Sequence, residues 1–179
     1  MVAAPPFRWT REGFLLAVEA GAFGESTVEL LDGEVYEIVS EGQPHRFATM
    51  LLQRALAQAF GETYIVRTEM GLPLGRSQPK PDVSVLRWDP EELRHRDEGA
   101  EDVVLVVEVV SSRPDTAEIK RSLYARAGVP EYWILDVAHR TLVTLQNPQD
   151  GTYGEVQTRL DGDQVVANGS VIAVRDLLP

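Results

Sequence analysis

The fold of this chain is decided by eight consecutive residues, Val103-Val104-Leu105-Val106-Val107-Glu108-Val109-Val110. Seven of them are Val or Leu, and a β-branched run of this length is typical of a central strand that is buried on both faces. Glu108 interrupts the run. An ionised carboxylate inside such a strand is costly unless it is paired or binds a metal, so the strand predicts either an ordinary ion pair at Glu108 or a functional site.

A second carboxylate precedes another apolar run. Asp82 opens the segment Val83-Ser84-Val85-Leu86 and follows Pro81, and proline is confined to the edges and ends of strands. We therefore expect Asp82 at the mouth of a strand, just as Glu108 lies near the end of its own.

Lys120 lies on a helix that we predict for residues 115–127, between a proline that suits a helix start and a glycine that suits a helix end. At roughly 100° per residue, Ile119, Leu123 and Ala127 form the inner stripe of this helix, and Lys120 lies inside the same apolar arc. A lysine on the inward side requires an anion, or it must extend its amine to water.

The choice between Arg and Lys in this chain also draws attention to Lys120. The chain has fifteen Arg and only two Lys, Lys80 and Lys120, which flank the acidic positions. An arginine does not replace a compact ammonium that must reach one oxygen atom. A lysine in such a chain is therefore a candidate for a specific role.

An Asp, a Glu and a Lys that converge at the end of a central strand are typical of a metal-assisted phosphodiester site. Carboxylates are hard oxygen ligands for Mg²⁺ (or Mn²⁺). The metal lowers the pKa of a bound water and stabilises charge on the phosphate. The lysine orients the attacking water or stabilises the developing oxyanion.

These residues resemble the PD-(D/E)xK nuclease superfamily and, more closely, its putative restriction endonuclease family, once catalogued only as a domain of unknown function. The likeness covers roughly residues 10 to 147. The matching text is Glu29-Leu30-Leu31-Asp32-Gly33-Glu34, His45, Pro81-Asp82-Val83-Ser84-Val85, Val107-Glu108-Val109-Val110-Ser111, Lys120, Tyr124 and Gly128-Val129-Pro130-Glu131-Tyr132-Trp133-Ile134-Leu135-Asp136.

The resemblance implies a restriction endonuclease-like fold and a Mg²⁺-dependent endonuclease that hydrolyses nucleic acid, with DNA as the expected substrate. Asp82, Glu108 and Lys120 match the catalytic positions, and the two carboxylates match the metal ligands. The superfamily pattern places the lysine two residues after the acid, where this chain has Val110. The resemblance implies that the lysine has moved onto the following helix, while Lys80 remains the alternative source of the cation.

Five further residues are candidates for contact with the substrate or for support of the ligands. They are Glu34, His45, Glu69, Lys80 and Tyr124. For Glu34 an ordinary solvated position on a hairpin is the favoured alternative. A surface or capping position is the favoured alternative for His45, although histidine titrates usefully near neutrality.

Several helices and strands can be predicted on either side of this site. Thr10 suits a helix cap, and an Asp-Gly pair between apolar runs predicts a hairpin. A strand, a helix and a second strand of this length predict a parallel pair with a right-handed crossover. The expected elements are a helix from residue 10 to about 21 with Phe14, Leu15 and Val18 inward, a hairpin of 28–31 and 34–39, a helix of 44–60 with Phe47, Met50, Leu51, Ala55, Leu56 and Ala59 as its apolar stripe, and strands at 63–67, 83–86, 103–110, 131–137, 140–145, 153–159, 165–166 and 171–174.

This pattern predicts one mixed α/β (α+β) domain over residues 1–179, with a central mixed sheet flanked by helices. We expect the core at about 44–147 and a C-terminal β extension at about 148–179, which could make contacts in a homo-oligomer. The segment at 88–100 is charged and rich in turns, and we expect a short exposed helix or a loop there.

Composition bounds the function. The chain has no cysteine, which excludes disulfides and thiolate metal sites, and no apolar run long enough to cross a membrane. The N-terminus has no signal-peptide pattern, so a cytoplasmic location is the default expectation.

The net charge of −11 opposes a non-specific DNA binder, because phosphate contacts dominate such affinity. A local basic cluster could still serve, with Arg67, Arg76, Lys80, Arg113 and Arg126 as its candidates. Two alternatives to the nuclease therefore remain: an inactive nuclease-fold protein that binds nucleic acid or a protein, and a scaffold in which Glu108 is merely paired.

Overall fold

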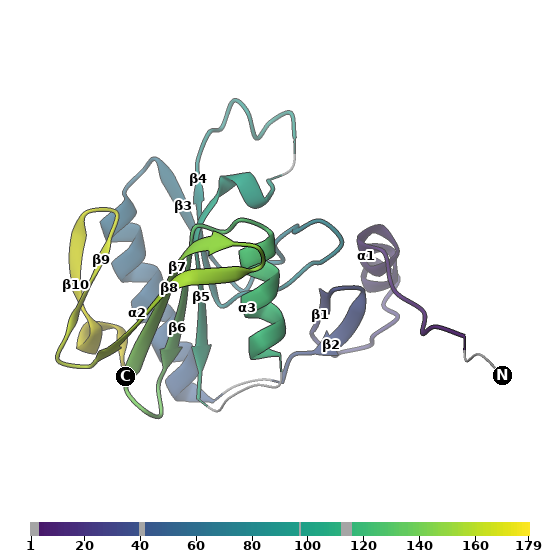
Figure 1. Cartoon of the computed structure of the whole chain (residues 1–179). Coiled ribbons are helices and arrows are strands. Elements are labelled where there is room, and N and C mark those ends of the chain that lie inside the picture. Colours follow the sequence, from purple (N-terminus) through teal and green to yellow (C-terminus); the bar gives the residue numbers. More distant parts are fainter. Residues whose placement is uncertain (1–3, 40–41, 97, 112–115) are drawn as a thin grey trace.

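A six-stranded mixed sheet in the order β3-β4-β5-β6-β7-β8 forms the centre of the protein (Figure 1). The computed structural model describes residues 4–39, 42–96, 98–111 and 116–179. The strands are β1 (Val28–Leu31), β2 (Glu34–Glu37), β3 (Tyr64–Thr68), β4 (Val83–Arg87), β5 (Val103–Val110), β6 (Glu131–Asp136), β7 (Thr141–Gln149), β8 (Thr152–Leu160), β9 (Gln164–Ala167) and β10 (Ser170–Ala173). The helices are α1 (Arg11–Glu19), α2 (Gln43–Phe60) and α3 (Ala117–Arg126), with short 3₁₀ turns η1 (Ala100–Asp102) and η2 (Val174–Leu177).

Strand β5 is the centre of this sheet, as its sequence predicts. It pairs antiparallel with β4 and parallel with β6, and α3 makes the crossover between the parallel strands. All its residues are buried except the half-buried Val104. The remaining pairs are antiparallel, so the predicted mixed sheet is confirmed.

Two helices cover opposite faces of the sheet (Figure 1). Leu52 and Leu56 of α2 pack in one core cluster with Val85 and Val107. Leu123 of α3 packs in the other cluster, which includes Val106 of β5. Because side chains alternate along a strand, Glu108 is directed to the α3 face. None of the described helices is long and apolar enough to cross a membrane.

The inward faces of α1 and α2 differ from the predicted ones. In α1, Thr10 caps the helix as expected by accepting the Gly13 N–H, but only Phe14 is buried, and Leu15 and Val18 are exposed. The reason is that α1 lies at the edge of the molecule (Figure 1), where Phe14 is its buried residue.

In α2, Phe47 and Met50 are 48% and 63% exposed, so the predicted stripe was wrong for these residues. The helix is apolar around most of its circumference, which leaves its orientation undecided by sequence. Packing on the sheet selects the face that begins at His45 and continues through Leu52 and Leu56.

The central sheet continues past the expected core boundary at residue 147. Strand β8 pairs with β7 and is the sixth strand of the sheet. Strands β9 and β10 form a two-stranded sheet of their own, which η2 follows. From these elements Val165, Val174 and Leu177 pack into the α2 core cluster. The predicted β extension is therefore partly sheet edge and partly core. The start predicted for the helix that carries Lys120, at residue 115, lies outside the described residues.

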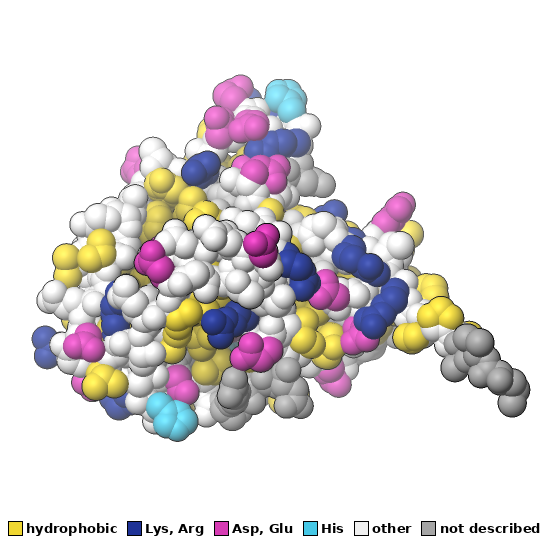
Figure 2. All heavy atoms as spheres, in the orientation of Figure 1, with side chains coloured by type: hydrophobic (Ala, Val, Ile, Leu, Met, Phe, Trp, Pro, Cys, Tyr) yellow, Lys and Arg dark blue, Asp and Glu magenta, His cyan; other side chains and the backbone are white. Residues whose placement is uncertain are grey.

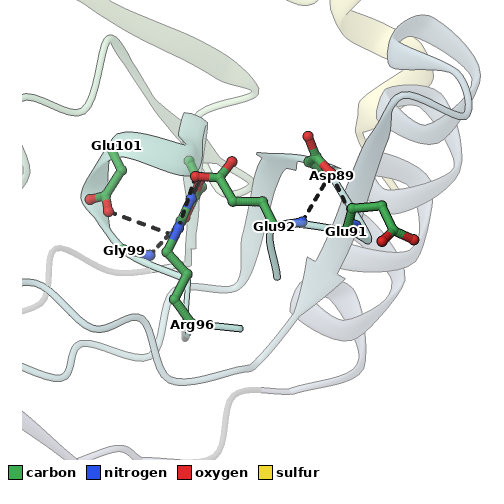
Figure 3. Close-up of polar contacts among 7 residues, drawn as sticks. Asp89, Glu91, Glu92, Arg96, Gly99 and Glu101 are labelled. Atoms are coloured by element: carbon green, nitrogen blue, oxygen red, sulfur yellow. Dashed lines mark hydrogen bonds and ion pairs between the residues drawn. The ribbon is translucent and has the colours of Figure 1, made fainter. Parts of the chain in front are cut away.

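The charged segment between β4 and β5 is fixed by ion pairs rather than fully solvated (Figure 3). The guanidinium of Arg96 donates to both carboxylate oxygens of Asp102 at 2.7 Å, and the Gly99 N–H donates to Asp102 at 2.9 Å. This segment joins the end of β4 to the start of β5. It therefore lies at the opposite end of these strands from Asp82 and Glu108.

Candidate active site

A cavity of about 920 Å³ lies at the strand ends that carry the two predicted carboxylates. The hairpin β1–β2, the start of α2 and the start of α3 complete its wall. The ionisable side chains that matter for its chemistry are Glu29, His45, Asp82, Glu108 and Lys120.

Asp82 and Glu108 face each other across neighbouring strands. The antiparallel register of β4 and β5 pairs Val83 with Val107. The same register places Asp82 opposite Glu108. Residues opposite each other in such a pair have Cβ atoms about 4.5–5.5 Å apart. The Val109 N–H donates to Asp82 Oδ2 at 2.7 Å, which fixes the aspartate against β5. Asp82 directly precedes β4, so its expected position at the mouth of a strand is confirmed.

Lys120 turns inward onto Glu108. Its Nζ lies 3.1 Å from both oxygens of Glu108, and both side chains are about nine-tenths buried. The Tyr124 hydroxyl, one helical turn later, donates to Glu108 Oε1 at 2.7 Å. The inward position of Lys120 in the apolar arc is therefore confirmed.

The second partner of Lys120 is Glu29, which sequence reasoning did not single out as a candidate. Glu29 Oε2 lies 3.1 Å from Lys120 Nζ and accepts the Lys80 N–H at 3.0 Å. Glu29 is only 3% exposed. It therefore ties the hairpin to both α3 and the segment before Asp82.

Glu34 has the ordinary solvated position on the hairpin that was the favoured alternative. Glu34 is half exposed at the surface, where it pairs with Arg8 at 2.5 Å and accepts the Tyr36 hydroxyl at 2.6 Å. Glu29 is named only within the stretch that resembles the family. Its signal is the same as that of Glu108, a single carboxylate inside an apolar strand.

His45 belongs to the site and not to the surface. It is 7% exposed, and its Nε2 lies 3.1 Å from Asp82 Oδ1. It is the first residue of the inward face of α2, and Thr49 on that face donates its hydroxyl to the His45 carbonyl at 3.1 Å. The surface interpretation was wrong because the inward face of α2 includes His45, which the predicted stripe left out.

The other candidates lie at the cavity wall or apart from it. Glu69 and Lys80 line the cavity, and the Glu69 N–H donates to the Asp82 carbonyl at 3.1 Å. The proposed basic cluster does not form as one group: Arg67 pairs with Glu98, and Arg126 pairs with Asp32 at 2.6 Å. Arg113 lies outside the described residues.

Burial and neighbouring charges determine the protonation of Glu108, Lys120 and Tyr124. Burial raises the pKa of Glu108 to about 7, against the attraction of Lys120, and the charges of Asp82 and Glu29 add to the rise. Burial alone would lower the pKa of Lys120, but Glu108 and Glu29 outweigh it and hold that pKa above its ordinary value. Burial also raises the pKa of Tyr124, so the tyrosine stays a neutral donor. Lys120 is therefore charged wherever Glu108 titrates.

Stability in metal-free buffer is expected to fall as the pH rises from about 5 to about 8. The folded-state pKa of Glu108, about 7, lies above the ordinary value of 4.5, so the folded protein keeps a proton that the unfolded chain releases. This stabilisation is fully present below the pKa of Glu108 in the unfolded chain. It is lost as the pH rises through the pKa of Glu108 in the folded protein. Thermal unfolding of the wild type and of Glu108→Gln in EDTA measures the effect. The same pH dependence in both proteins would contradict it.

The donor set fits a weakly held Mg²⁺ or Mn²⁺. Across the described ranges, no group of three or more His, Cys, Asp or Glu side chains is spaced to hold a metal ion. Mg²⁺ commonly uses only one or two carboxylates and completes its shell with water and phosphate oxygens. Asp82 and Glu108 supply two, and the ammonium of Lys120 is shared between two carboxylates, Glu108 and Glu29.

Two comparisons with known proteins find similarity to putative nucleases. A family model, Uma2, described as "Putative restriction endonuclease", matches residues 15–174. A crystal structure of a putative nuclease belonging to DUF820 from Anabaena variabilis ATCC 29413 has the same fold, with a TM-score of 0.71 and 16% sequence identity over 94% of this chain and 97% of that chain. The search of curated proteins found no match.

Proposed function

The chain belongs to the Uma2 family of putative restriction endonucleases, and on this basis we propose that it is a Mg²⁺- or Mn²⁺-dependent endonuclease that hydrolyses phosphodiester bonds of DNA. One observation carries the proposal: Asp82 stands opposite Glu108 on the neighbouring strand, and the buried ammonium of Lys120 contacts Glu108 in an open cavity. This is the arrangement of acid, acid and lysine that the PD-(D/E)xK resemblance implies.

Asp82 and Glu108 would hold the cation. When bound, it supplies charge for the phosphate and lowers the pKa of a bound water. His45 and the Val109 N–H orient one carboxylate, and Tyr124 orients the other. These contacts keep the two carboxylates in place without the cation.

Lys120 would act on the phosphate. Its ammonium stays charged at neutral pH because Glu108 and Glu29 hold its pKa high. A fixed positive charge near the reacting phosphate stabilises the negative charge that develops there. Lys80 lines the same cavity and is the alternative donor of this charge.

A cleavage assay tests the proposal. Purified protein is incubated with single- and double-stranded DNA and with RNA, in Mg²⁺, in Mn²⁺ and in EDTA. We expect internal cuts in DNA with either metal and none in EDTA. Cleavage that persists in EDTA, or the absence of cleavage with any substrate when metal binding is demonstrated by calorimetry, would contradict the proposed activity.

One observation favours a second candidate, a nucleic-acid-binding or protein-binding module without catalysis. Lys120 already engages both oxygens of Glu108, as a purely structural ion pair would. Such a protein should show no heat of Mg²⁺ or Mn²⁺ binding. The cleavage assay together with calorimetry separates the two candidates, because a module without catalysis cuts no substrate with either metal.

A further inference from the structure

A basic hollow of about 400 Å³ lies beside the N-terminal segment. It is lined by Arg8, Trp9, Thr10, Arg11, Gly75 and Arg76. Figure 2 shows Lys and Arg side chains gathered on the side of the molecule that carries α1, although the chain as a whole has a net charge of −11. The hollow is therefore a local exception to the acidic surface.

Two of its arginines keep their charge available. Arg8 pairs with Glu34, and the nearby Asp32 is taken by Arg126. Arg11 Nε donates to the neutral amide oxygen of Gln78 at 2.6 Å. Among the described residues, neither Arg11 nor Arg76 has a carboxylate within ion-pair distance.

Arg76 is seated on the turn of the β1–β2 hairpin. A Cβ atom at Gly33 would lie 2.8 Å from Arg76 Nη2 and 3.1 Å from the Trp9 carbonyl oxygen. Gly33 also has a φ of +84°, which favours glycine. The close approach of three segments therefore places the guanidinium beside the N-terminal arginines.

The segment from Arg76 to Lys80 joins the hollow to the active-site cavity, and it lies between β1 and residues 72–74. It runs antiparallel beside β1. The Ser77 hydroxyl accepts the Asp32 N–H at 3.0 Å. At the other end, the Lys80 N–H reaches Glu29 in the cavity wall. Ser77 and Pro79 are buried, whereas Arg76, Gln78 and Lys80 alternate with them and are at least partly exposed. These three side chains therefore form the outward side of the segment, along which a polyanion can extend from Arg76 toward Lys80.

Aromatic side chains alternate with the basic ones. The N-terminal segment reads Phe7-Arg8-Trp9-Thr10-Arg11. Phe7 is 79% exposed, and its ring packs edge-on against Trp9 with centroids 5.7 Å apart. Grooves that combine arginines with exposed aromatic rings bind unpaired nucleotides, because a base that is not in a duplex can stack on the ring.

We propose that this strip, defined as residues 7–11 and 76–80, binds a single strand of DNA. Its phosphates lie at Arg11 and Arg76, a base stacks on Phe7, and the strand reaches the cavity past Lys80. The inference rests on the proposed nuclease function and names the class of substrate for that site.

Binding without cleavage tests the strip. Fluorescence anisotropy in EDTA measures the affinity for oligo(dT) and for its duplex with oligo(dA), in the wild type and in Arg76→Gln, Phe7→Ala and Arg175→Gln. Arg175 is an exposed arginine of η2, on the opposite side of the molecule from α1 (Figure 1). It is the matched control for loss of one positive charge.

The strip predicts tighter binding of oligo(dT) than of the duplex. Phe7→Ala should weaken oligo(dT) binding at least about fivefold. Arg76→Gln should reduce the slope of log affinity against log salt concentration by about 0.7 for each phosphate that the protein no longer neutralises. Arg175→Gln should match the wild type. A preference for the duplex, no binding of either probe, or unchanged affinity in Arg76→Gln overturns the strip.

The two proposals can fail separately. If the protein cleaves DNA with Mn²⁺ but all variants bind oligo(dT) equally, the proposed nuclease function stands and the proposed binding strip is wrong. If binding depends on Arg76 and Phe7 but no DNA is cleaved, the proposed binding strip stands and the proposed nuclease function is wrong.

Discussion

The Glu108→Gln variant is expected to lose metal-dependent cleavage by about a thousandfold or more, because metal ions contribute several kcal/mol to such reactions and each 1.36 kcal/mol is about tenfold in rate. Glutamine keeps the shape of the side chain and an oxygen that can accept the Tyr124 hydroxyl. It removes the charge that would bind the cation. Lys120 keeps Glu29 as its partner, so the fold should persist.

Calorimetry should show that Glu108→Gln binds Mg²⁺ and Mn²⁺ much more weakly than the wild type. Glu131→Gln is the matched control, because Glu131 is a partly buried carboxylate of the neighbouring strand β6 that accepts from Trp133 and Gln146 and does not line the cavity. Normal cleavage by Glu108→Gln, or equal losses in both variants, would remove Glu108 from the reaction.

The Lys120→Met variant is expected to lose about a hundredfold to a thousandfold in turnover, the usual cost of one group that stabilises developing charge, while metal binding is retained. It should also be destabilised by about 3–5 kcal/mol at pH 8, because Glu108 and Glu29 are left buried without their cation. The cost should shrink at pH 5, where Glu108, with a pKa of about 7, is protonated. Urea unfolding at both pH values and single-turnover cleavage measure the two effects.

Lys120→Arg and Lys80→Met complete this experiment. Arginine should restore turnover poorly, since a planar fork does not replace a compact ammonium that contacts Glu108 and Glu29. Lys80 contributes only its backbone N–H to Glu29, so Lys80→Met should leave stability unchanged. Normal turnover in Lys120→Met together with its loss in Lys80→Met would assign the catalytic charge to Lys80.

The sequence by itself determined the features that depend on neighbouring residues. The unbroken β-branched run of β5 specifies a buried central strand, and a helix of 3.6 residues per turn places Lys120 among its inner residues. The Asp-Gly turn specifies the β1–β2 hairpin. These local rules, together with the family resemblance, were sufficient to predict Asp82, Glu108 and Lys120 at one end of a mixed sheet.

Only the tertiary structure decided which side chains complete the site. Helix α2 is apolar on several sides, so its rotation, and with it the inward position of His45, follows from packing on the sheet. The choice of Glu29 rather than Glu34 depends on how the hairpin docks against α3 and the segment at Lys80. Periodicity specifies the faces of one element, but the partner of a buried charge is set by the long-range contacts that desolvate it.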